Sequence, residues 1–520
     1  MSSSRGTSMN PKPNVLFIVT DQHTPGVAGF AGDPVVCTPH LDDLASRSLQ
    51  FETASCASPA CTPSRMCLLT AMEPHRCAAW ANHWIIFPEQ VTWPGHFAGH
   101  GYATCLVGKM HFGGKDQLHG FQTRPYGDFH HGLSHQPEPL GFFPSYHGAE
   151  SAGVTEIPES LIQDVVVTRE AQAFILEHHD RNPDQPWFLC AGYGRPHAPF
   201  TAPGRYIRRY RDRIPPLEQP ADCADRLEPY ARRLYDRLNS HLTEEQIRRG
   251  REAYYACVDY VDDCIGELLG TLRQNGLLEN TLVIYTSDHG EMGGAHGLWQ
   301  KSVYYEESMG VPLLITGPGV RPGHARLSEV VSLMDLFPTC CSLAGLPIPP
   351  GLDGMDFSAL LRDPVRGQSP REFAPSQYCQ WGTRIKTHAL PIGQPTRAWR
   401  AIRTRDWKYV DVQGGKPLLF DMANDPREMT NLAERPEHAE RCGRLRQKLF
   451  QGFDWEEAMA QLRADRDRVP DLVSGIQPTT PNQYRLPDGR IFDAEASLYQ
   501  ARWLPVDDNA TGGIIPQQFG

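Results

Sequence analysis

Short apolar runs separated by longer amphipathic stretches constrain this chain more than any other feature. The stretches at 160–179 and 244–274 repeat their apolar residues with helical periodicity, and the second ends close to Gly276, a residue type favoured just beyond a helix. Apolar runs of this kind are typical of parallel strands that are covered by helices on both faces. The sequence therefore predicts an α/β fold, a mostly parallel sheet flanked by helices, with strands at Val15–Val19, Ala103–Val107, Trp187–Ala191, Thr281–Thr286 and Val311–Ile315.

The length of 520 residues predicts a second, smaller unit, because single cores stop growing at roughly 250 to 300 residues. Towards the C-terminus the pattern changes to short strand-like segments, followed by a helical stretch at 436–450. This change predicts a small antiparallel sheet with one helix. We expect a tail at 1–13, a large domain at 14–385, a small α+β subdomain at 386–468 and a C-terminal tail at 469–520.

Aromatic residues are frequent in the C-terminal tail, although Pro, Gly, Asn and Gln dominate its composition. Tyr484, Phe492, Tyr499 and Trp503 are examples, and such side chains favour packing against a surface over free disorder. We expect that surface to belong to another copy of the chain, so the sequence predicts a homo-oligomer.

Charge, cysteine content and the N-terminus narrow the range of partners. The formal charge of -11 argues against nucleic acid or an anionic membrane, since both reward clustered Lys and Arg. The cysteines, 14 in all, lack the dense spacing of a secreted disulfide scaffold. Residues 1–14 contain no apolar core, and the run that follows is too short for a signal peptide or a membrane span. We therefore expect a soluble cytoplasmic protein that acts on a small molecule.

Acidic and polar residues follow two of the predicted strands at the point where each ends. Asp21 and Gln22 come after the first strand, and Asp288 and His289 follow the strand that begins at Thr281. Open α/β sheets bind ligands beyond the carboxyl ends of their strands, so we expect these side chains to lie together. Two carboxylates, an amide carbonyl and an imidazole form a site for a hard divalent cation, for which we expect Ca²⁺ before Mn²⁺ or Mg²⁺.

The pentapeptide Cys61-Thr62-Pro63-Ser64-Arg65 resembles the signature of the type I sulfatases, members of the alkaline phosphatase-like superfamily. The residues after it continue the pattern, with Ala71 where the family usually has Gly. The resemblance implies that a formylglycine-generating enzyme oxidises Cys61 to Cα-formylglycine (3-oxoalanine). The hydrate of that aldehyde attacks the sulfur of a sulfate ester, and its collapse back to the aldehyde expels sulfate.

The signature also predicts local structure. Pro63 suits the first turn of a helix, so residue 61 is expected at a helix N-terminus, whose unpaired N–H groups favour an anion. Arg65, within the first turns of that helix, is expected to steady the hydrate and to offset negative charge.

Further segments between about residues 14 and 346 resemble the same family in the same order. Asp21 with Gln22 and Asp288 with His289 match the family's two pairs of metal ligands, and the modified Cys61 completes the set. Gln22 and His289 stand where many members have Asp and Asn. These variants are similar to those of choline sulfatases and phosphonate monoester hydrolases.

Two pairs of residues match family segments that handle charge and protons. In Gly108-Lys109-Met110-His111, the resemblance implies that Lys109 holds the hydrate and a sulfate oxygen, and that His111 takes the proton from the remaining hydroxyl. His197 and Lys301 match segments that stabilise the bridging oxygen. Both are therefore candidates for sulfate binding and for protonation of the leaving group.

A weaker candidate for sulfate contact, Asn82, follows the signature helix. The main alternative activity is that of a phosphonate monoester or phosphodiester hydrolase, which generally lacks the Lys109 and His111 pair. A binding protein with unmodified Cys61 is a second alternative, and a phosphatase would need Ser or Thr at that position. The segment Ser376–Trp381 contains no acid to neutralise a choline cation, so the alcohol part of the substrate stays open.

Overall fold

The computed structural model describes residues 12–82, 84–113, 116–127, 148–150, 152–155, 157–379, 398–473, 483–485 and 491–493. Trp381 and most of the two predicted tails lie outside these residues. None of the helices in these ranges is both long and apolar enough to cross a membrane.

The central sheet has eight strands, and every strand except β9 runs parallel to the others. All eight residues of β1 are buried, which is typical of a central parallel strand covered on both faces. In spatial order the strands are β10 (Ala325–Ser332), β2 (Leu49–Ser55), β9 (Leu313–Thr316), β8 (Thr281–Ser287), β1 (Asn14–Asp21), β6 (Trp187–Pro196), β3 (Ala103–Gly108) and β4 (Thr123–Tyr126).

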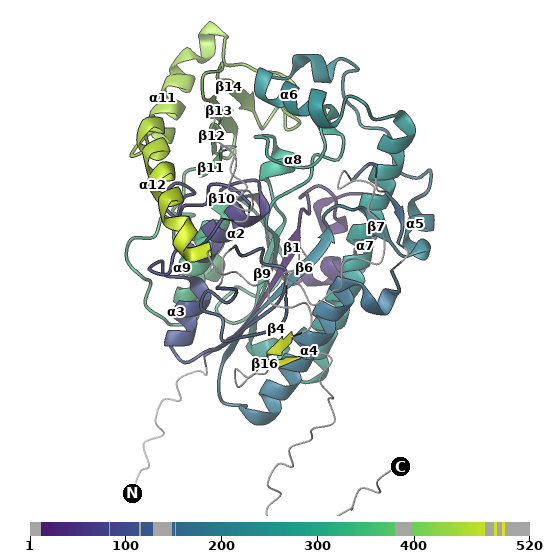
Figure 1. Ribbon diagram of the computed structural model, residues 1–520, viewed down its shortest axis with the longest axis vertical. Coiled ribbons are helices and arrows are strands. Elements are labelled where there is room, and N and C mark those ends of the chain that lie inside the picture. The colour runs from purple at the N-terminus through teal and green to yellow at the C-terminus, as the bar shows by residue number, and fades with distance from the viewer. Residues whose placement is uncertain are drawn as a thin grey trace, which may run out of the picture.

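Helices cover both faces of this sheet, so that it forms the middle layer of the molecule (Figure 1). Apolar side chains of each helical layer form a core with the strand residues that face it. One layer contains α2 (Cys61–Thr70), α3 (Trp93–Gly99), α9 (Leu336–Leu343), α10 (Ser358–Arg362) and α12 (Trp455–Val473). The other contains α1 (Pro39–Ala45), α4 (Gln163–Arg181), α5 (Gly204–Tyr210) and α7 (Glu244–Gln274).

A second, antiparallel sheet contains β11 (Ala374–Cys379), β12 (Ala398–Arg403), β13 (Trp407–Val412) and β14 (Leu418–Asp421). The helix α11 (Ala439–Leu449) packs on one of its faces through Leu445 and Leu449. Both the α/β class and the small antiparallel sheet with a helix are therefore confirmed. Because β11 begins before residue 386 and α12 continues to Val473, elements cross both boundaries expected for the subdomain, and the division into domains stays a prediction.

Shorter elements complete the fold. The helices α6 (Pro229–Leu238) and α8 (Glu306–Met309) lie near the small sheet (Figure 1). Two-stranded pairs are β5 (Gly153–Val154) with β7 (Thr201–Ala202) and β15 (Gln483–Arg485) with β16 (Ile491–Asp493). Short 3-10 helices lie at Gly29–Ala31, Glu159–Leu161, Cys223–Arg226, Leu278–Asn280, Ala295–Gly297, Leu333–Asp335 and Pro436–His438.

The register between β1 and β8 brings two acidic residues together. Thr20 pairs with Ser287 at the carboxyl ends of these parallel neighbours. Asp21 and Asp288 come next in each chain segment, so the fold places both carboxylates at one edge of the sheet, as the strand-end argument predicts.

Candidate active site

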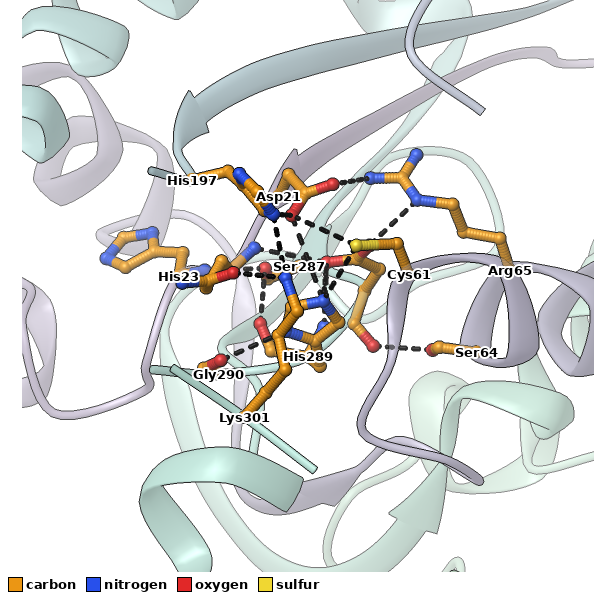
Figure 2. Close-up of polar contacts among 12 residues, drawn as sticks. Asp21, His23, Cys61, Ser64, Arg65, His197, Ser287, His289, Gly290 and Lys301 are labelled. Atoms are coloured by element: carbon orange, nitrogen blue, oxygen red, sulfur yellow. Dashed lines mark hydrogen bonds and ion pairs between the residues drawn. The ribbon is translucent and has the colours of Figure 1, made fainter. Parts of the chain in front are cut away.

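The carboxyl ends of β1 and β8 meet the first turn of α2 (Figure 2). One ligand atom from each of Asp21, Cys61, Asp288 and His289 lies within 4.8 Å of the other three, and all four residues are buried. The Sγ atom of Cys61 is 3.3 Å from Nε2 of His289 and 3.8 Å from Oδ1 of Asp21. The chain thus brings its signature cysteine and its predicted metal ligands into one cluster.

The helix α2 begins at Cys61, as the position of Pro63 predicts. Ala60 before it is extended and offers no capping side chain, but Asn82 Oδ1 accepts the backbone N–H of Thr62 at 3.1 Å. Asn82 therefore lies at the start of the helix, next to residue 61. The helix is buried along its whole length, and the Ser64 hydroxyl donates to the carbonyl of Asp288, which joins the helix to the end of β8.

Arg65 connects the two strand ends by binding a carboxylate from each. Its Nε donates to Oδ2 of Asp288 at 2.8 Å, its Nη2 to Oδ2 of Asp21 at 3.1 Å and its Nη1 to the Lys109 carbonyl at 2.7 Å. The three acceptors match the fixed fan of guanidinium donors, which a lysine could not satisfy together. Oδ1 of Asp21 is left facing Cys61 and His289.

Lys109 and His111 reach the cysteine from the end of β3. The Lys109 ammonium lies 2.5 Å from Oδ2 of Asp21, and both side chains are fully buried. The His111 side chain is hydrogen-bonded to that of Cys61, and its carbonyl accepts the Thr62 hydroxyl at 3.0 Å. Burial and the Cys61 charge both raise the pKa of Asp21, but Lys109, His197 and Arg65 outweigh them and hold it well below its usual range.

His197 and Lys301 form a pair on another side of the cluster, with Nζ of Lys301 2.7 Å from Nε2 of His197. Nδ1 of His197 lies 2.6 Å from the Ala198 carbonyl oxygen, which assigns the proton to Nδ1 and the lone pair to Nε2. Burial, and then the charges of Lys301 and Lys109, lower the pKa of His197 to about 4. His197 is therefore neutral near pH 7 and accepts a hydrogen bond from the lysine.

The loop that carries Lys301 is held on both sides. Gln300 and Ser302 have φ angles of 68° and 79°, in the left-handed region that side chains rarely adopt. The Gln300 N–H donates to the Glu291 carboxylate at 2.6 Å, and the Ser302 N–H donates to the Pro59 carbonyl at 3.1 Å. These two hydrogen bonds fix the strained backbone on either side of Lys301, and the Lys301 side chain points at the cluster (Figure 2).

Gln22, the remaining predicted ligand, is oriented by its neighbours. Its side-chain N–H donates to Glu291, and its Oε1 accepts from Lys301. Its carbonyl accepts the Tyr254 hydroxyl at 2.8 Å, and the φ angle of Gln22 is 69°. Glu291 and Tyr254 are not among the residues predicted from the sequence, although Glu291 stands three positions after Asp288 in the same segment.

The donor set fits one divalent cation. Ca²⁺ binds oxygen at about 2.3 to 2.6 Å, so two of its ligands lie between about 3.3 Å and about 5.2 Å apart, depending on the angle at the metal. Nε2 of His289 lies 3.8 Å from Asp21 Oδ1 and 3.6 Å from Asp288 Oδ1, within that range. The second ring nitrogen of His289 is 3.0 Å from the Gly290 carbonyl, which leaves Nε2 as the ligand atom. Sγ of Cys61 stands where an oxygen of the oxidised side chain would be.

The electrostatic environment favours an anion at residue 61. Burial alone would raise the pKa of the Cys61 thiol, but Lys301, Lys109, His289 and His111 together hold it well below its usual range. Cations and imidazoles therefore converge on this side chain from three other segments of the chain. A negatively charged group bound beside residue 61 would be stabilised in the same way.

All the residues predicted for the site lie in or beside this cluster. Asp21, Cys61, Asp288 and His289 form its centre, and the rest contact them directly or through one neighbour: Gln22, Arg65, Asn82, Lys109, His111, His197 and Lys301. Their separate roles in binding and catalysis stay predictions.

Comparisons with known proteins agree with this arrangement. The family model described as "Sulfatase" matches residues 13–346, and the model described as "N-sulphoglucosamine sulphohydrolase, C-terminal" matches residues 294–453. The chain is 33% identical over 450 residues to the choline-sulfatase of Rhizobium meliloti (strain 1021), covering 82% of this chain and 83% of that protein. It is 30% identical over 444 residues to an ulvan-active sulfatase of Formosa agariphila, covering 82% and 78%.

Among solved structures, the phosphonate monoester hydrolase of Agrobacterium radiobacter superposes with a TM-score of 0.71 at 23% identity, covering 92% of this chain and 99% of that chain. At this identity the likeness shows a shared fold. The family assignment rests on the sulfatase model, which spans the site from β1 to the segment after Lys301. The chain therefore belongs to the sulfatase family and is a sulfuric ester hydrolase with an alkaline phosphatase-like fold.

Proposed function

We propose that this protein hydrolyses an organic sulfate monoester with Cα-formylglycine, made by oxidation of Cys61, and one divalent cation. The observation that carries the proposal is the cluster of Asp21, Cys61, Asp288 and His289 within 4.8 Å, surrounded by the buried side chains of Lys109 and Arg65 and by the half-buried Lys301. Such a site holds a tetrahedral oxyanion against residue 61. The hydrated aldehyde supplies a hydroxyl that attacks sulfur and displaces the alcohol. The side chain then collapses back to the aldehyde and expels sulfate.

Asp21, Gln22, Asp288, His289 and the oxidised residue 61 would hold the cation, which we propose is Ca²⁺, with Mn²⁺ or Mg²⁺ as alternatives. A bound cation would draw charge from a sulfate oxygen. The Gln22 amide oxygen faces the lysine side of the site because Glu291 accepts its N–H.

Lys109 and Arg65 would stabilise the negative charge that develops beside residue 61. Lys109 lies between Asp21 and the cysteine and is completely buried, so its charge acts at short range in a dry environment. Arg65 holds both strand-end carboxylates and keeps the site assembled. His111, hydrogen-bonded to the side chain of residue 61, would take the proton whose loss releases sulfate.

Lys301 is our candidate for the proton donor to the leaving oxygen. In the His197–Lys301 pair the imidazole has its proton on Nδ1 and is neutral, so the ammonium of Lys301 carries the proton that can be transferred. His197 would orient that ammonium through Nε2 and keep it close to the ester oxygen.

The alternative activity, hydrolysis of phosphonate monoesters or phosphodiesters, agrees with the shared fold of the Agrobacterium enzyme. Lys109 and His111 favour sulfate, because that group of hydrolases generally lacks the pair. Both esters place a tetrahedral oxyanion at the same position, so we propose low activity on phosphonates beside the main activity on sulfates.

We further propose a reducing, cytoplasmic location, a formylglycine-generating enzyme as maturation partner and assembly into a homo-oligomer through the C-terminal tail. All 14 cysteines are free thiols, which suits a reducing compartment. A free Cys61 also provides the substrate that the maturation enzyme needs.

The test is release of sulfate from choline, aryl and sugar sulfates, run beside a phosphonate monoester, after expression with a formylglycine-generating enzyme. We expect release from at least one sulfate ester, and loss of that activity in Cys61→Ala. Faster turnover of the phosphonate than of every sulfate ester would support the alternative. Absence of turnover with all of these esters would refute the proposal.

A further inference from the structure

A cleft contains Lys301 in its lining but none of the predicted metal ligands. The described residues that line it come from α6, from the loop that follows His296 and from β11: Leu234, Arg237, Leu238, Leu298, Trp299, Gln300, Lys301, Ser302, Val303 and Tyr378. Because Lys301 belongs to both the cleft and the active site, an ester bound with its sulfate against residue 61 would extend its alcohol part into this cleft.

The charge of the cleft is positive. Among its described lining residues there are two cations, Arg237 and Lys301, and no carboxylate. Lys301 is engaged with Gln22 and His197 inside the site, whereas Arg237 forms no ion pair with any described part of the chain. Arg232 on the same helix, in contrast, pairs with Asp225 and Asp236.

The remaining lining suits the flat or hydrocarbon body of a ring. The half-buried Tyr378 and Leu234 contribute aromatic and apolar surface, and the buried side chains of Trp299, Leu298 and Val303 support the floor of the cleft. Tyr378 lies in β11, and the centroid of its ring is 6.4 Å from that of Trp399. This contact holds the Tyr378 ring in position at the side of the cleft. A ring stacked here would carry its substituents outwards to α6, where the guanidinium of Arg237 lies.

We propose that Arg237 is a specificity-determining residue that binds a second anionic group on the substrate. The substrates would then be ring sulfates that bear a carboxylate or a second sulfate in addition to the ester that is cleaved. The inference rests on the proposed function. A quaternary ammonium such as choline would meet two cations and no carboxylate among the described lining residues, and is disfavoured.

The expected effect is moderate, because Arg237 is exposed to solvent. A guanidinium can bind a carboxylate with two parallel hydrogen bonds, and this geometry strengthens a surface pair above the usual exposed ion pair. We expect a preference for the anionic substrate of about threefold to tenfold. Salt should weaken this preference, since exposed charges are screened over about 8 to 10 Å at ordinary ionic strength.

The experiment compares 4-carboxyphenyl sulfate with 4-carbamoylphenyl sulfate, which has nearly the same shape and carries a neutral amide in place of the carboxylate. The quantity measured is the ratio of the two kcat/KM values, so that differences in leaving-group chemistry cancel between variants. Arg237→Gln removes the charge, Arg237→Lys keeps the charge without the paired donors, and Arg233→Gln makes the same charge change on α6 outside the cleft. Thermal unfolding of each variant checks that the fold is intact.

We expect the ratio to fall about threefold to tenfold in Arg237→Gln, to take an intermediate value in Arg237→Lys and to keep its wild-type value in Arg233→Gln. An equal ratio in wild type and Arg237→Gln, or an equal fall in Arg233→Gln, would overturn the inference while leaving the proposed function intact. Absence of hydrolysis of both esters, and of every other sulfate ester, by protein with oxidised Cys61 would overturn the proposed function and the inference together.

Discussion

The orientation of the Gln22 amide gives a sharp prediction about metal binding. Glu291 accepts three N–H groups, from Gln22, from Gly293 at 2.9 Å and from Gln300 at 2.6 Å. A carboxylate can only accept, so it holds the NH₂ group of Gln22 on its own side and the Oε1 atom on the side of Lys301 and the proposed cation. Glu291→Gln keeps the volume of the side chain but removes both the charge and this restriction.

The size of the effect follows from the bonds that are weakened. Hydrogen bonds to a charged group contribute about 1.5 to 3 kcal/mol and neutral ones about 0.5 to 1.5 kcal/mol, so each of the three bonds loses about 1 kcal/mol or more. Because the bond between Gln22 and Glu291 is one of the three that are weakened, the Gln22 amide can then turn its NH₂ group towards the proposed cation. Mutation of a residue that orients a metal ligand typically lowers metal affinity 10- to 100-fold, which corresponds to about 1.4 to 2.7 kcal/mol of binding free energy. We expect a loss of this size.

The assay is calorimetric titration of metal-free protein with Ca²⁺, which does not depend on catalysis. Glu307→Gln is the matched control, because Glu307 is a half-buried glutamate in α8 whose Oε2 atom is shielded from solvent and whose side chain makes none of the contacts described for Gln22. We expect a 10- to 100-fold higher Kd in Glu291→Gln and a change of less than about twofold in the control. Equal Kd values for wild type and Glu291→Gln would refute the reasoning.

Three further predictions test other parts of the site. A strong chelator should inactivate the enzyme and added Ca²⁺ should restore it, because we propose that Asp21 and Asp288 bind a cation needed for catalysis; activity that survives complete removal of metal would contradict the metal site. His111→Ala should slow sulfate release more than ester cleavage, seen as a burst of alcohol followed by a stalled covalent enzyme, and equal loss in both steps would remove this assignment. Arg65→Lys should lower the free energy of unfolding of the metal-free protein by about 3 kcal/mol in urea titrations, since one ammonium cannot serve three buried acceptors, whereas Arg248→Lys, at a side chain that is 40% exposed, should change it by less than about 0.5 kcal/mol.

The parts of the fold that the sequence predicts are those with strong local patterns. The continuous apolar runs in β1, β3, β6 and β8 identify the buried centre of the sheet, and the predicted strand at Val311–Ile315 overlaps β9. The pattern did not reveal β2 or β10, because polar residues interrupt both strands towards the edge of the sheet. The helix α12 was also missed, although most of it lies within the expected small subdomain.

The candidate site was more accessible to sequence reasoning than the substrate cleft. Asp21, Cys61 and Asp288 stand beside strand ends or in a signature, so their proximity follows from the order of a parallel sheet. Glu291 contacts a distant segment of the chain, and Arg237 lies in a cleft that distant segments form, and no local pattern indicates either arrangement. The positions of side chains on α6 and β11 depend on how the small sheet packs on the large one, which a single sequence does not specify.

The oxidation state of residue 61 is the central claim, and mass spectrometry of the peptide that contains Cys61 measures it directly. Batches of protein made with different amounts of the formylglycine-generating enzyme would give different fractions of aldehyde at this residue. We predict that specific activity on the best sulfate ester rises in proportion to the aldehyde fraction and reaches zero when only thiol is present. Full activity in protein whose residue 61 is entirely unmodified cysteine would contradict the account.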